Sequence, residues 1–214
     1  MNELLEMTEA RMHVYNMLRN IFANEPTMKV LKSLSNGVLK DLSENEDVKE
    51  GVEKMAEASR EIKNTRDLDE LHAEFARLFL MGKMAVPPYE SLYKGGKTLM
   101  GDAAVAVRKE YLEEGLQVEK LYQEPDDHIA TEFEFMFFLC KKTVAALKKS
   151  GEKKAGAFLA KQRDFMETHL GNWAPQFCDK ILDSTNSDFY RGAALLTKGF
   201  IEEDSRFLKE AGEK

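Results

Sequence analysis

The chain has 214 residues, of which 43% are hydrophobic and 32% charged, and its formal net charge at pH 7 is −7. A chain of this length buries about 70% of its unfolded surface around a core. The composition excludes disordered, collagen-like and low-complexity proteins. Lysine and arginine are scattered along the chain rather than gathered into a stripe, so binding to nucleic-acid phosphates is not expected.

The cysteines and the N-terminal segment both bear on the cellular compartment. Cys140 and Cys178 lie in apolar helical patterns without CxxC or Cys/His spacing, so we expect reduced, buried thiols. Acidic residues from Glu3 to Glu9 occur where a secretory signal needs an uncharged core, and the longest uncharged apolar run, 135–140, is too short to span a bilayer. The sequence therefore predicts a cytoplasmic protein without stable membrane insertion.

Apolar residues recur at steps of three and four along nearly the whole chain, which predicts an all-α fold, a single multi-helix domain over 1–214 with about nine helices. In chain order, the expected helices span 2–23, 27–41, 46–62, 67–81, 98–114, 126–149, 152–169, 172–183 and 188–209. One long loop, 82–97, interrupts them, because its prolines and glycines stop helix formation. A loop of this length in a compact domain is usually functional.

Residue types at the ends of these segments support the assignment. Ser43 and Glu46 have the spacing of a capping box. The other expected signals are N-caps at Asn172 and Ser187 and glycine stops at Gly82, Gly115 and Gly151.

The segment 94–98, KGGKT, resembles the end of a Walker A phosphate loop. The first glycine of that motif would be at the position of Ser91, and no buried strand precedes it. The segment therefore favours a flexible glycine turn capped by Thr98. A nucleotide- or cofactor-binding protein is a second hypothesis.

His128 and Glu132 are four residues apart, on one face of the helix expected to begin near Pro125, as metal ligands on a helix are. No second histidine lies at ligand spacing, and no HExxH or GxSxG motif occurs. Asp126 and Asp127 are typical of a helix start, where they offset the positive end of the helix dipole. A helical metal-dependent hydrolase is thus a third hypothesis, and the sequence favours a protein that is not an enzyme.

The apolar face of the helix 67–81 carries one histidine and two phenylalanines. His72 is expected to be a hydrogen-bonded core residue. Phe75 and Phe79 are core residues by their helical spacing, although a groove built by this helix would expose one of them.

Four segments, in this order along the chain, resemble the TorD/DmsD/NarJ family of cytoplasmic chaperones for molybdoenzyme maturation. They are Arg11-x-x-x-Tyr15-x-x-Leu18-x-x-x-Phe22, Glu74-Phe75-x-Arg77-Leu78-Phe79, Pro87-Pro88-Tyr89-Glu90-Ser91-Leu92-Tyr93 and Glu124-Pro125-Asp126-Asp127-His128. The resemblance covers roughly residues 10–200, and the last two segments are the most specific. The short Pro-Asp-His core of the family has an extra aspartate here, so Asp126 and Asp127 are both candidates for the acidic role.

The resemblance implies an all-helical chaperone that binds the twin-arginine signal peptide of a molybdopterin-dependent oxidoreductase. Such a protein holds the apo catalytic subunit until the cofactor is inserted, before export, and performs no covalent chemistry. The peptide-binding residues that it implies are Tyr89, Glu90, Ser91, Tyr93, Asp126, Asp127 and His128, with Phe75 and Phe79 nearby.

The chemistry of these residues agrees with such a ligand. Two arginines followed by an apolar stretch need carboxylates that accept from guanidinium groups and an apolar wall. The candidate carboxylates are Glu90, Asp126, Asp127 and Glu132, and the candidate wall residues are Tyr89, Tyr93 and Phe135.

The expected partners are the signal peptide and the apo catalytic subunit, not nucleic acid, and the expected assembly is a monomer or a domain-swapped dimer. No metal or permanently bound cofactor is expected, with at most weak GTP binding. A guanine-nucleotide- or molybdenum-cofactor-binding accessory protein of the same pathway is the main alternative.

Overall fold

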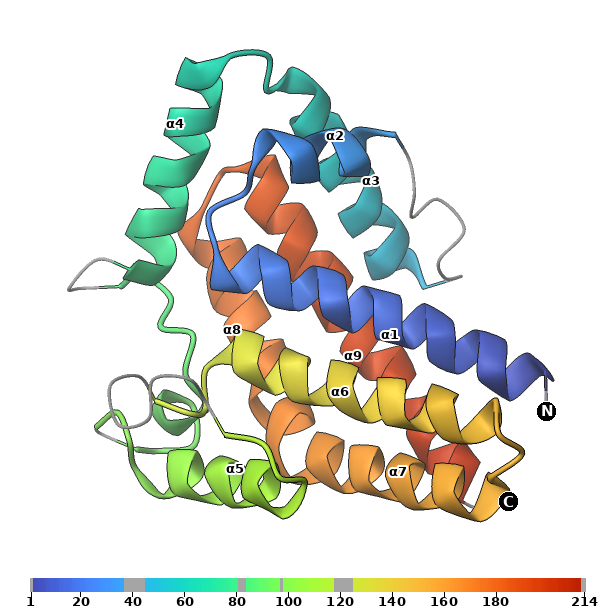
Figure 1. Ribbon diagram of the computed structural model, residues 1–214. Coiled ribbons are helices and arrows are strands. Elements are labelled where there is room, and N and C mark those ends of the chain that lie inside the picture. The colour runs from blue at the N-terminus through green and yellow to red at the C-terminus, as the bar shows by residue number, and fades with distance from the viewer. Residues whose placement is uncertain (1, 37–44, 81–83, 97, 118–124, 213–214) are drawn as a thin grey trace. The chain divides into compact units, whose positions relative to one another are not determined.

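The computed structural model of the protein describes residues 2–36, 45–80, 84–96, 98–117 and 125–212 (Figure 1). Ser43, Gly82, Lys97 and Glu124, all considered above, lie outside these ranges. The described residues form nine α-helices and no strand, which confirms the all-α fold and the approximate number of helices. None of these helices is both long enough and apolar enough to cross a membrane.

The helices are α1 (Asn2–Ala23), α2 (Met28–Ser35), α3 (Glu46–Glu61), α4 (Thr65–Phe75), α5 (Asp102–Glu113), α6 (Ile129–Leu147), α7 (Glu152–Phe165), α8 (Gly171–Ser184) and α9 (Asp188–Gly212). Two π-helical segments, Ala76–Leu80 and Met166–Leu170, directly follow α4 and α7, and a short 3-10 turn spans Glu90–Leu92.

The chain divides into two compact units. The first unit contains residues 1–20, 89–173 and 204–214, and the second contains residues 21–88 and 174–203. Each unit is described separately below. A single functional domain over 1–214 stays a prediction.

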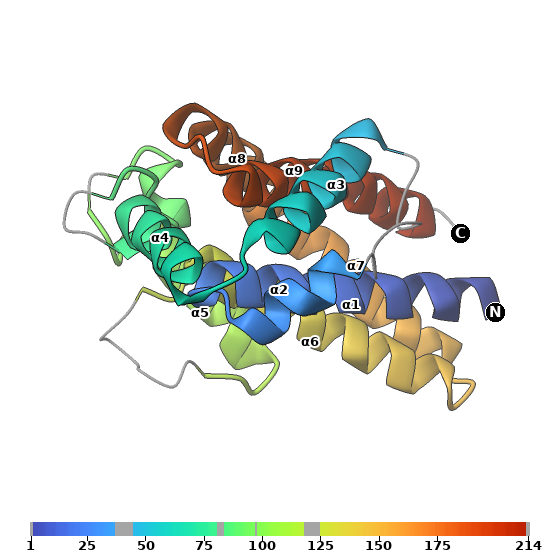
Figure 2. The same cartoon turned by 90° about the horizontal axis from the view of Figure 1, so that it is seen from above.

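In the first unit, α6 and α7 pack side by side (Figures 1 and 2). The turn between them contains Ser150 with a φ of 54°, and the amide of Gly151 donates to the carbonyl of Ala146 at 3.0 Å. The glycine expected to stop α6 is therefore the N-cap of α7 instead, and a serine adopts the left-handed conformation. At the end of α5 the expectation is confirmed, because Gly115 has a φ of 72°.

A buried ion pair joins α1 to α9 within the first unit. The guanidinium of Arg11 donates through Nε to Asp204 Oδ1 and through Nη2 to Asp204 Oδ2, the latter at 3.0 Å. The hydroxyl of Tyr15 donates to the same carboxylate at 2.5 Å, and Gln162 of α7 accepts from Arg11 Nη2 at 2.7 Å. The four-residue spacing of Arg11 and Tyr15 thus brings both side chains to one buried carboxylate.

In the second unit, α3 and α9 approach each other closely enough to require glycine. A Cβ on Gly51 would lie 2.4 Å from the backbone nitrogen of Leu196. A Cβ on Gly192 would lie 2.7 Å from the carbonyl oxygen of Gly51. Any larger residue at either position therefore requires the two helix backbones to move apart.

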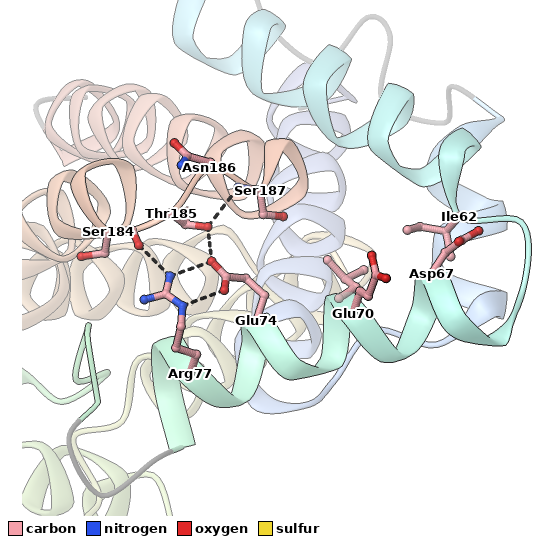
Figure 3. A pocket seen from close by; sticks show the side chains of 10 residues that line it. Ile62, Asp67, Glu70, Glu74, Arg77, Ser184, Thr185, Asn186 and Ser187 are labelled. Carbon is pink, nitrogen blue, oxygen red and sulfur yellow. Dashed lines mark hydrogen bonds and ion pairs between the residues drawn. The ribbon is translucent and has the colours of Figure 1, made fainter.

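The second family segment has a structural role in the second unit (Figure 3). Arg77 donates to both carboxylate oxygens of Glu74 at 2.7 Å and to the carbonyl of Ser184 at 2.6 Å. The hydroxyl of Thr185 also donates to Glu74. These bonds tie α4 and the π-helical segment after it to the turn between α8 and α9, at one wall of an open groove of about 640 Å³.

Phe75 and Phe79 are both core residues of the second unit rather than surface residues. Their rings contact each other with centroids 5.2 Å apart, and both are almost fully buried. His72 is only half-buried, and its Nε2 lies 2.8 Å from the carbonyl of Pro26, so the expected hydrogen bond is present without full burial.

Each cysteine is buried and free in its own unit, as expected. Cys140 lies on α6 in the first unit, and Cys178 lies on α8 in the second.

Three helix starts differ from the sequence expectation. The N-cap of α3 is Asn45, whose side chain accepts from two backbone amides, rather than Ser43. Asn172 lies inside α8, because the π-helical segment continues α7 directly into α8 without a break. The helix α6 begins at Ile129, not near Pro125.

Candidate functional site

The first unit brings together the two most specific family segments. Tyr89 and His128 form an isolated antiparallel bridge. The amide of Glu90 donates to the carbonyl of Asp127 at 3.0 Å, and the amide of Ser91 donates to the Asp127 carboxylate at 2.7 Å. Two loops that are 36 residues apart therefore form one continuous site.

Four acidic side chains of this site are buried. Glu90, Asp127 and Glu132 are 0% exposed, and Asp126 is 1% exposed. Buried charges require ionic or hydrogen-bonding partners, or else they take up protons. The carboxylates are therefore not free surface acceptors. The ionic and hydrogen-bonding partners of each carboxylate determine whether it holds a charge or a proton.

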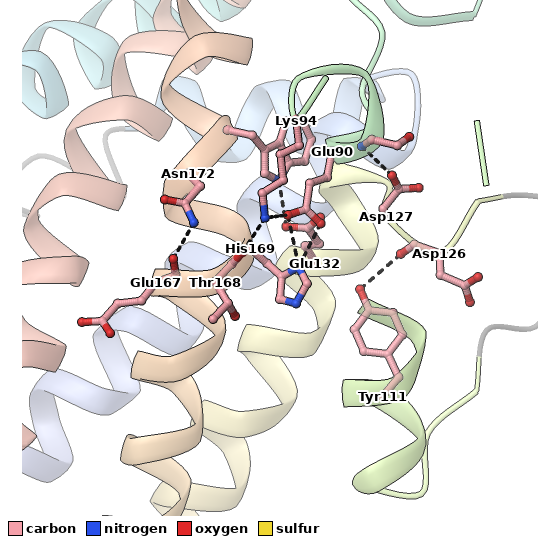
Figure 4. A network of polar contacts seen from close by, with 12 residues as sticks. Glu90, Lys94, Tyr111, Asp126, Asp127, Glu132, Glu167, Thr168, His169 and Asn172 are labelled. Carbon is pink, nitrogen blue, oxygen red and sulfur yellow. Dashed lines mark hydrogen bonds and ion pairs between the residues drawn. The ribbon is translucent and has the colours of Figure 1, made fainter. Parts of the chain in front are cut away.

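Glu90 lies at the centre of a polar network (Figure 4). Nδ1 of His169 lies 2.9 Å from its Oε2, and Nζ of Lys94 donates to its Oε1 at 2.8 Å. The same ammonium donates to the carbonyl of Thr168 at 2.6 Å. Thr168 and His169 belong to the π-helical segment Met166–Leu170, a conformation that is frequent at functional sites.

Glu132 projects from the first turn of α6 toward Trp173. The indole Nε1 of Trp173 donates to Glu132 Oε2 at 3.0 Å, while Oε1 has no hydrogen-bond partner among the described residues. Burial, followed by the nearby charges of Glu90 and Asp127, raises the pKa of Glu132 well above its ordinary value of 4.5. The folded protein thus binds a proton at Glu132 more tightly than the unfolded chain does.

We expect Glu132→Gln to stabilise the protein increasingly as pH rises. Because the pKa of Glu132 is higher in the folded state, the wild-type free energy of unfolding falls as pH rises from about 4.5 through the raised pKa. Glutamine keeps an acceptor for Trp173 and removes this dependence. Urea unfolding at pH 5 and pH 8 should show a larger gain at pH 8. Glu134→Gln, at an exposed position of the same helix, is the control, and equal gains from both variants would refute the assignment.

The two aspartates have different partners. Asp126 forms an ion pair with Arg108 of α5, at 2.9 Å from Nε, and its carbonyl accepts from the hydroxyl of Tyr111 at 3.3 Å. Asp127 holds the amide of Ser91, and its Oδ1 has no partner within the described part of the chain. Burial raises the pKa of Asp127, against the lowering effect of that amide. Of the two, Asp127 is the aspartate that joins the two family segments.

His128 is the N-cap of α6, with its Nδ1 accepting from the amide of Ala130 at 3.1 Å. It precedes the helix, and its side chain bonds the helix backbone whereas the Glu132 carboxylate bonds Trp173, so the structure shows no common partner for His128 and Glu132. The ring of Tyr89 packs edge-on against His128 with centroids 5.2 Å apart. Among the described residues, no three His, Cys, Asp or Glu side chains are placed to hold a metal ion.

The remaining candidates divide between surface and interior. Tyr89, Tyr93 and His128 are half-buried and form the accessible part of the site, whereas Ser91 is buried. The ring of Tyr93 packs on Trp173 at 5.2 Å. Phe75 and Phe79 lie in the core of the second unit.

Within the KGGKT segment, residues 94–96 form a turn rather than the start of a helix. Gly95 has a φ of 80°, and the amide of Gly96 donates to the carbonyl of Ser91 at 3.0 Å. The next helix, α5, starts only at Asp102. The favoured turn is therefore present, and one of its amides is already bonded within the protein.

Sequence reasoning missed several members of the network. His169 and Trp173 reach Glu90 and Glu132 through the π-helical segment, for which the sequence carries no recognised signal. Lys94 was considered only as part of a phosphate loop. Its spacing of four residues from Glu90, typical of an ion pair, was the signal available.

Comparison with known proteins gives consistent results. A family model described as Nitrate reductase delta subunit matches residues 42–179. A chaperone protein TorD of Vibrio parahaemolyticus is 31% identical, over 97% of this chain and 99% of its own length. The chaperone proteins TorD of Vibrio atlanticus and Photobacterium profundum are each 30% identical, over 100% and 97% of this chain and 100% and 98% of their own lengths.

Proposed function

The chain belongs to the TorD/DmsD/NarJ family of molybdoenzyme maturation chaperones, to which the nitrate reductase delta subunit model also corresponds, and from this premise we propose its ligand. The protein binds the twin-arginine signal peptide of a molybdopterin-dependent oxidoreductase in the cytoplasm. It holds the apo catalytic subunit until the cofactor is inserted, before export. It acts as a binding protein, as a monomer or a domain-swapped dimer, and without a permanently bound cofactor.

The observation that carries the proposal is the joined pair of loops in the first unit. Tyr89 and His128 form an accessible aromatic surface, and their sequence neighbours Glu90 and Asp127 carry buried carboxylates. A cationic peptide that approaches this surface meets aromatic faces suited to guanidinium groups, with negative charge nearby. The Asp127 carboxylate holds the two loops together, and the buried carboxylates give the site its negative charge.

Exposed apolar side chains are also present in the same unit. The 3-10 turn of Glu90–Leu92 packs against α5, and four exposed apolar residues lie on α5 and the segment before it. They are Leu99, Met100, Val105 and Leu112. The seven-residue spacing of Val105 and Leu112 places both on one exposed face of α5. They suit the apolar stretch that follows the two arginines of such a signal peptide.

Calorimetric titration with a synthetic twin-arginine signal peptide tests the proposal. We expect micromolar binding, at least tenfold weaker for a Lys-Lys peptide, because a planar guanidinium stacks on aromatic rings and offers more donors than an ammonium group does. Tyr89→Ala/His128→Asn should weaken binding by about tenfold or more, as expected for loss of aromatic contacts at a binding surface. Asparagine preserves the N-cap of α6.

The control is His13→Ala, at an exposed position of α1 in the same unit. Melting temperatures establish that each variant is folded. Unchanged affinity of a folded Tyr89→Ala/His128→Asn variant would remove the proposed site, and no binding of any twin-arginine peptide would remove the proposed ligand.

A further inference from the structure

Lys94 is the solvent-facing partner of a buried carboxylate. Its side chain is 37% exposed, whereas that of Glu90 is 0% exposed and that of His169, the other partner, is 8% exposed. Of the two described side-chain partners of Glu90, Lys94 is therefore the more exposed to solvent, and Figure 4 shows its ammonium bonded to both Glu90 and Thr168.

The ammonium of Lys94 occupies a site with two acceptors from different segments. It bonds Glu90 Oε1 at 2.8 Å and the carbonyl of Thr168 at 2.6 Å. We call these two oxygens, with His169 behind them, the cation seat. A carboxylate and a carbonyl within reach of one nitrogen are also within reach of a guanidinium, which has five donors instead of three.

Lys94 is placed so that it can leave the cation seat without unfolding its surroundings. The residues that follow it, Gly95 and Gly96, are exposed, and Gly95 has a φ of 80°. Because its side chain is 37% exposed, Lys94 keeps part of its hydration in the cation seat and has a short path to solvent. Glu90, in contrast, is buried and needs a cation, so another cation must replace the ammonium when it departs.

From this geometry, and resting on the proposed function, we infer that Lys94 is an internal competitor of the signal peptide. In the free chaperone Lys94 fills the cation seat, and on binding one arginine of the twin-arginine pair displaces it to solvent.

This exchange accounts for discrimination between arginine and lysine. A peptide lysine that replaces Lys94 exchanges one ammonium for another and gains no new contact. A guanidinium is more weakly hydrated than an ammonium and forms a planar fork of donors, so the same exchange is favourable for arginine. The internal lysine thus lowers the affinity of both peptides by the same factor, and the advantage of the guanidinium in the cation seat remains as the difference between them.

Two substitutions of Lys94 test the inference by shifting affinity in opposite directions. Lys94→Met keeps the aliphatic stem but leaves the cation seat open, so the twin-arginine and Lys-Lys peptides should both bind about tenfold tighter, with their ratio unchanged. Lys94→Arg provides a stronger internal competitor, so both peptides should bind more weakly. A purely structural role for Lys94 would not produce opposite shifts.

Lys109→Met, at an exposed lysine of α5, measures the general effect of removing one positive charge near a cationic ligand. If the wild-type protein binds the twin-arginine peptide but Lys94→Met binds no tighter than Lys109→Met, the inference is overturned and the proposed function stands. The same holds if Lys94→Arg binds as tightly as wild type. If none of these proteins binds the peptide, the proposed function itself fails. Lys94→Met could unfold the protein by leaving the buried Glu90 without a cation. Lys94→Arg keeps a positive charge beside Glu90, so the affinity of this folded variant still tests the inference.

Discussion

Replacing Arg11 with methionine is expected to lower the free energy of unfolding by about 3–5 kcal/mol, because it leaves the carboxylate of Asp204 buried without its cation. Asp204 is 1% exposed at its side chain, and among the side-chain donors in the described part of the chain Tyr15 would remain bonded to it. For a chain of this size, the melting temperature should fall by roughly 6 to 20 °C. Urea unfolding followed by circular dichroism measures the loss directly.

A double variant and a surface control sharpen this prediction. Arg11→Met/Asp204→Asn removes both charges and keeps an acceptor for Tyr15, so it should recover part of the lost stability. Arg19 lies on the same helix α1 as Arg11 and forms an exposed ion pair with Glu134 of α6. Arg19→Met breaks that pair and should change the free energy of unfolding by at most about 1 kcal/mol. Equal losses of unfolding free energy from Arg11→Met and Arg19→Met would show that the buried ion pair contributes no more to stability than the exposed one.

Gly51→Ala is expected to destabilise the protein by about 1–3 kcal/mol, or more if the helices cannot separate. The added Cβ would lie 2.4 Å from a backbone nitrogen and 2.7 Å from a backbone oxygen of α9. Backbone atoms inside a helix cannot rotate away as a flexible side chain does. The strain therefore exceeds the gain in helix propensity of about 0.5–1 kcal/mol that alanine brings.

Gly156→Ala in α7 is the matched control, because no heavy atom lies within 4 Å of the Cβ it would add. That substitution should stabilise the protein by about 0.5–1 kcal/mol through helix propensity alone. Thermal unfolding of both variants tests the pair. A stabilising Gly51→Ala would mean that α3 and α9 are not in the close contact described above.

Helical periodicity was sufficient to predict the helices but not the way they begin. The ranges expected for α1, α3 and α9 agree with the structure to within a few residues, because their apolar faces extend over many turns. At α6, Pro125 and two aspartates have the composition of a helix start, yet they form the loop that pairs with residues 89–91. Tertiary hydrogen bonds to Asp127 outweigh the local preference there.

At the candidate site, too, local sequence patterns do not predict the tertiary contacts. The resemblance identified the two loops that the structure joins, but burial of the carboxylates depends on neighbours that are distant in sequence. His169 lies in the π-helical segment and Trp173 in the first turn of α8, and no apolar pattern encodes the π-helical turn or the bonds of these residues to Glu90 and Glu132. Gly51 and Gly192 were likewise unremarkable in sequence, because a close approach between helices has no local signal.

The burial of both native thiols makes the protein well suited to site-specific labelling. Burial raises the pKa of Cys140 to about 12 and raises that of Cys178 as well, so at neutral pH neither forms the thiolate that maleimides and iodoacetamides attack. A single cysteine introduced on the exposed surface would then be the reactive position without removal of the native pair. A fluorophore attached in this way next to Tyr89 would test the proposed peptide binding in real time on the otherwise unaltered chain.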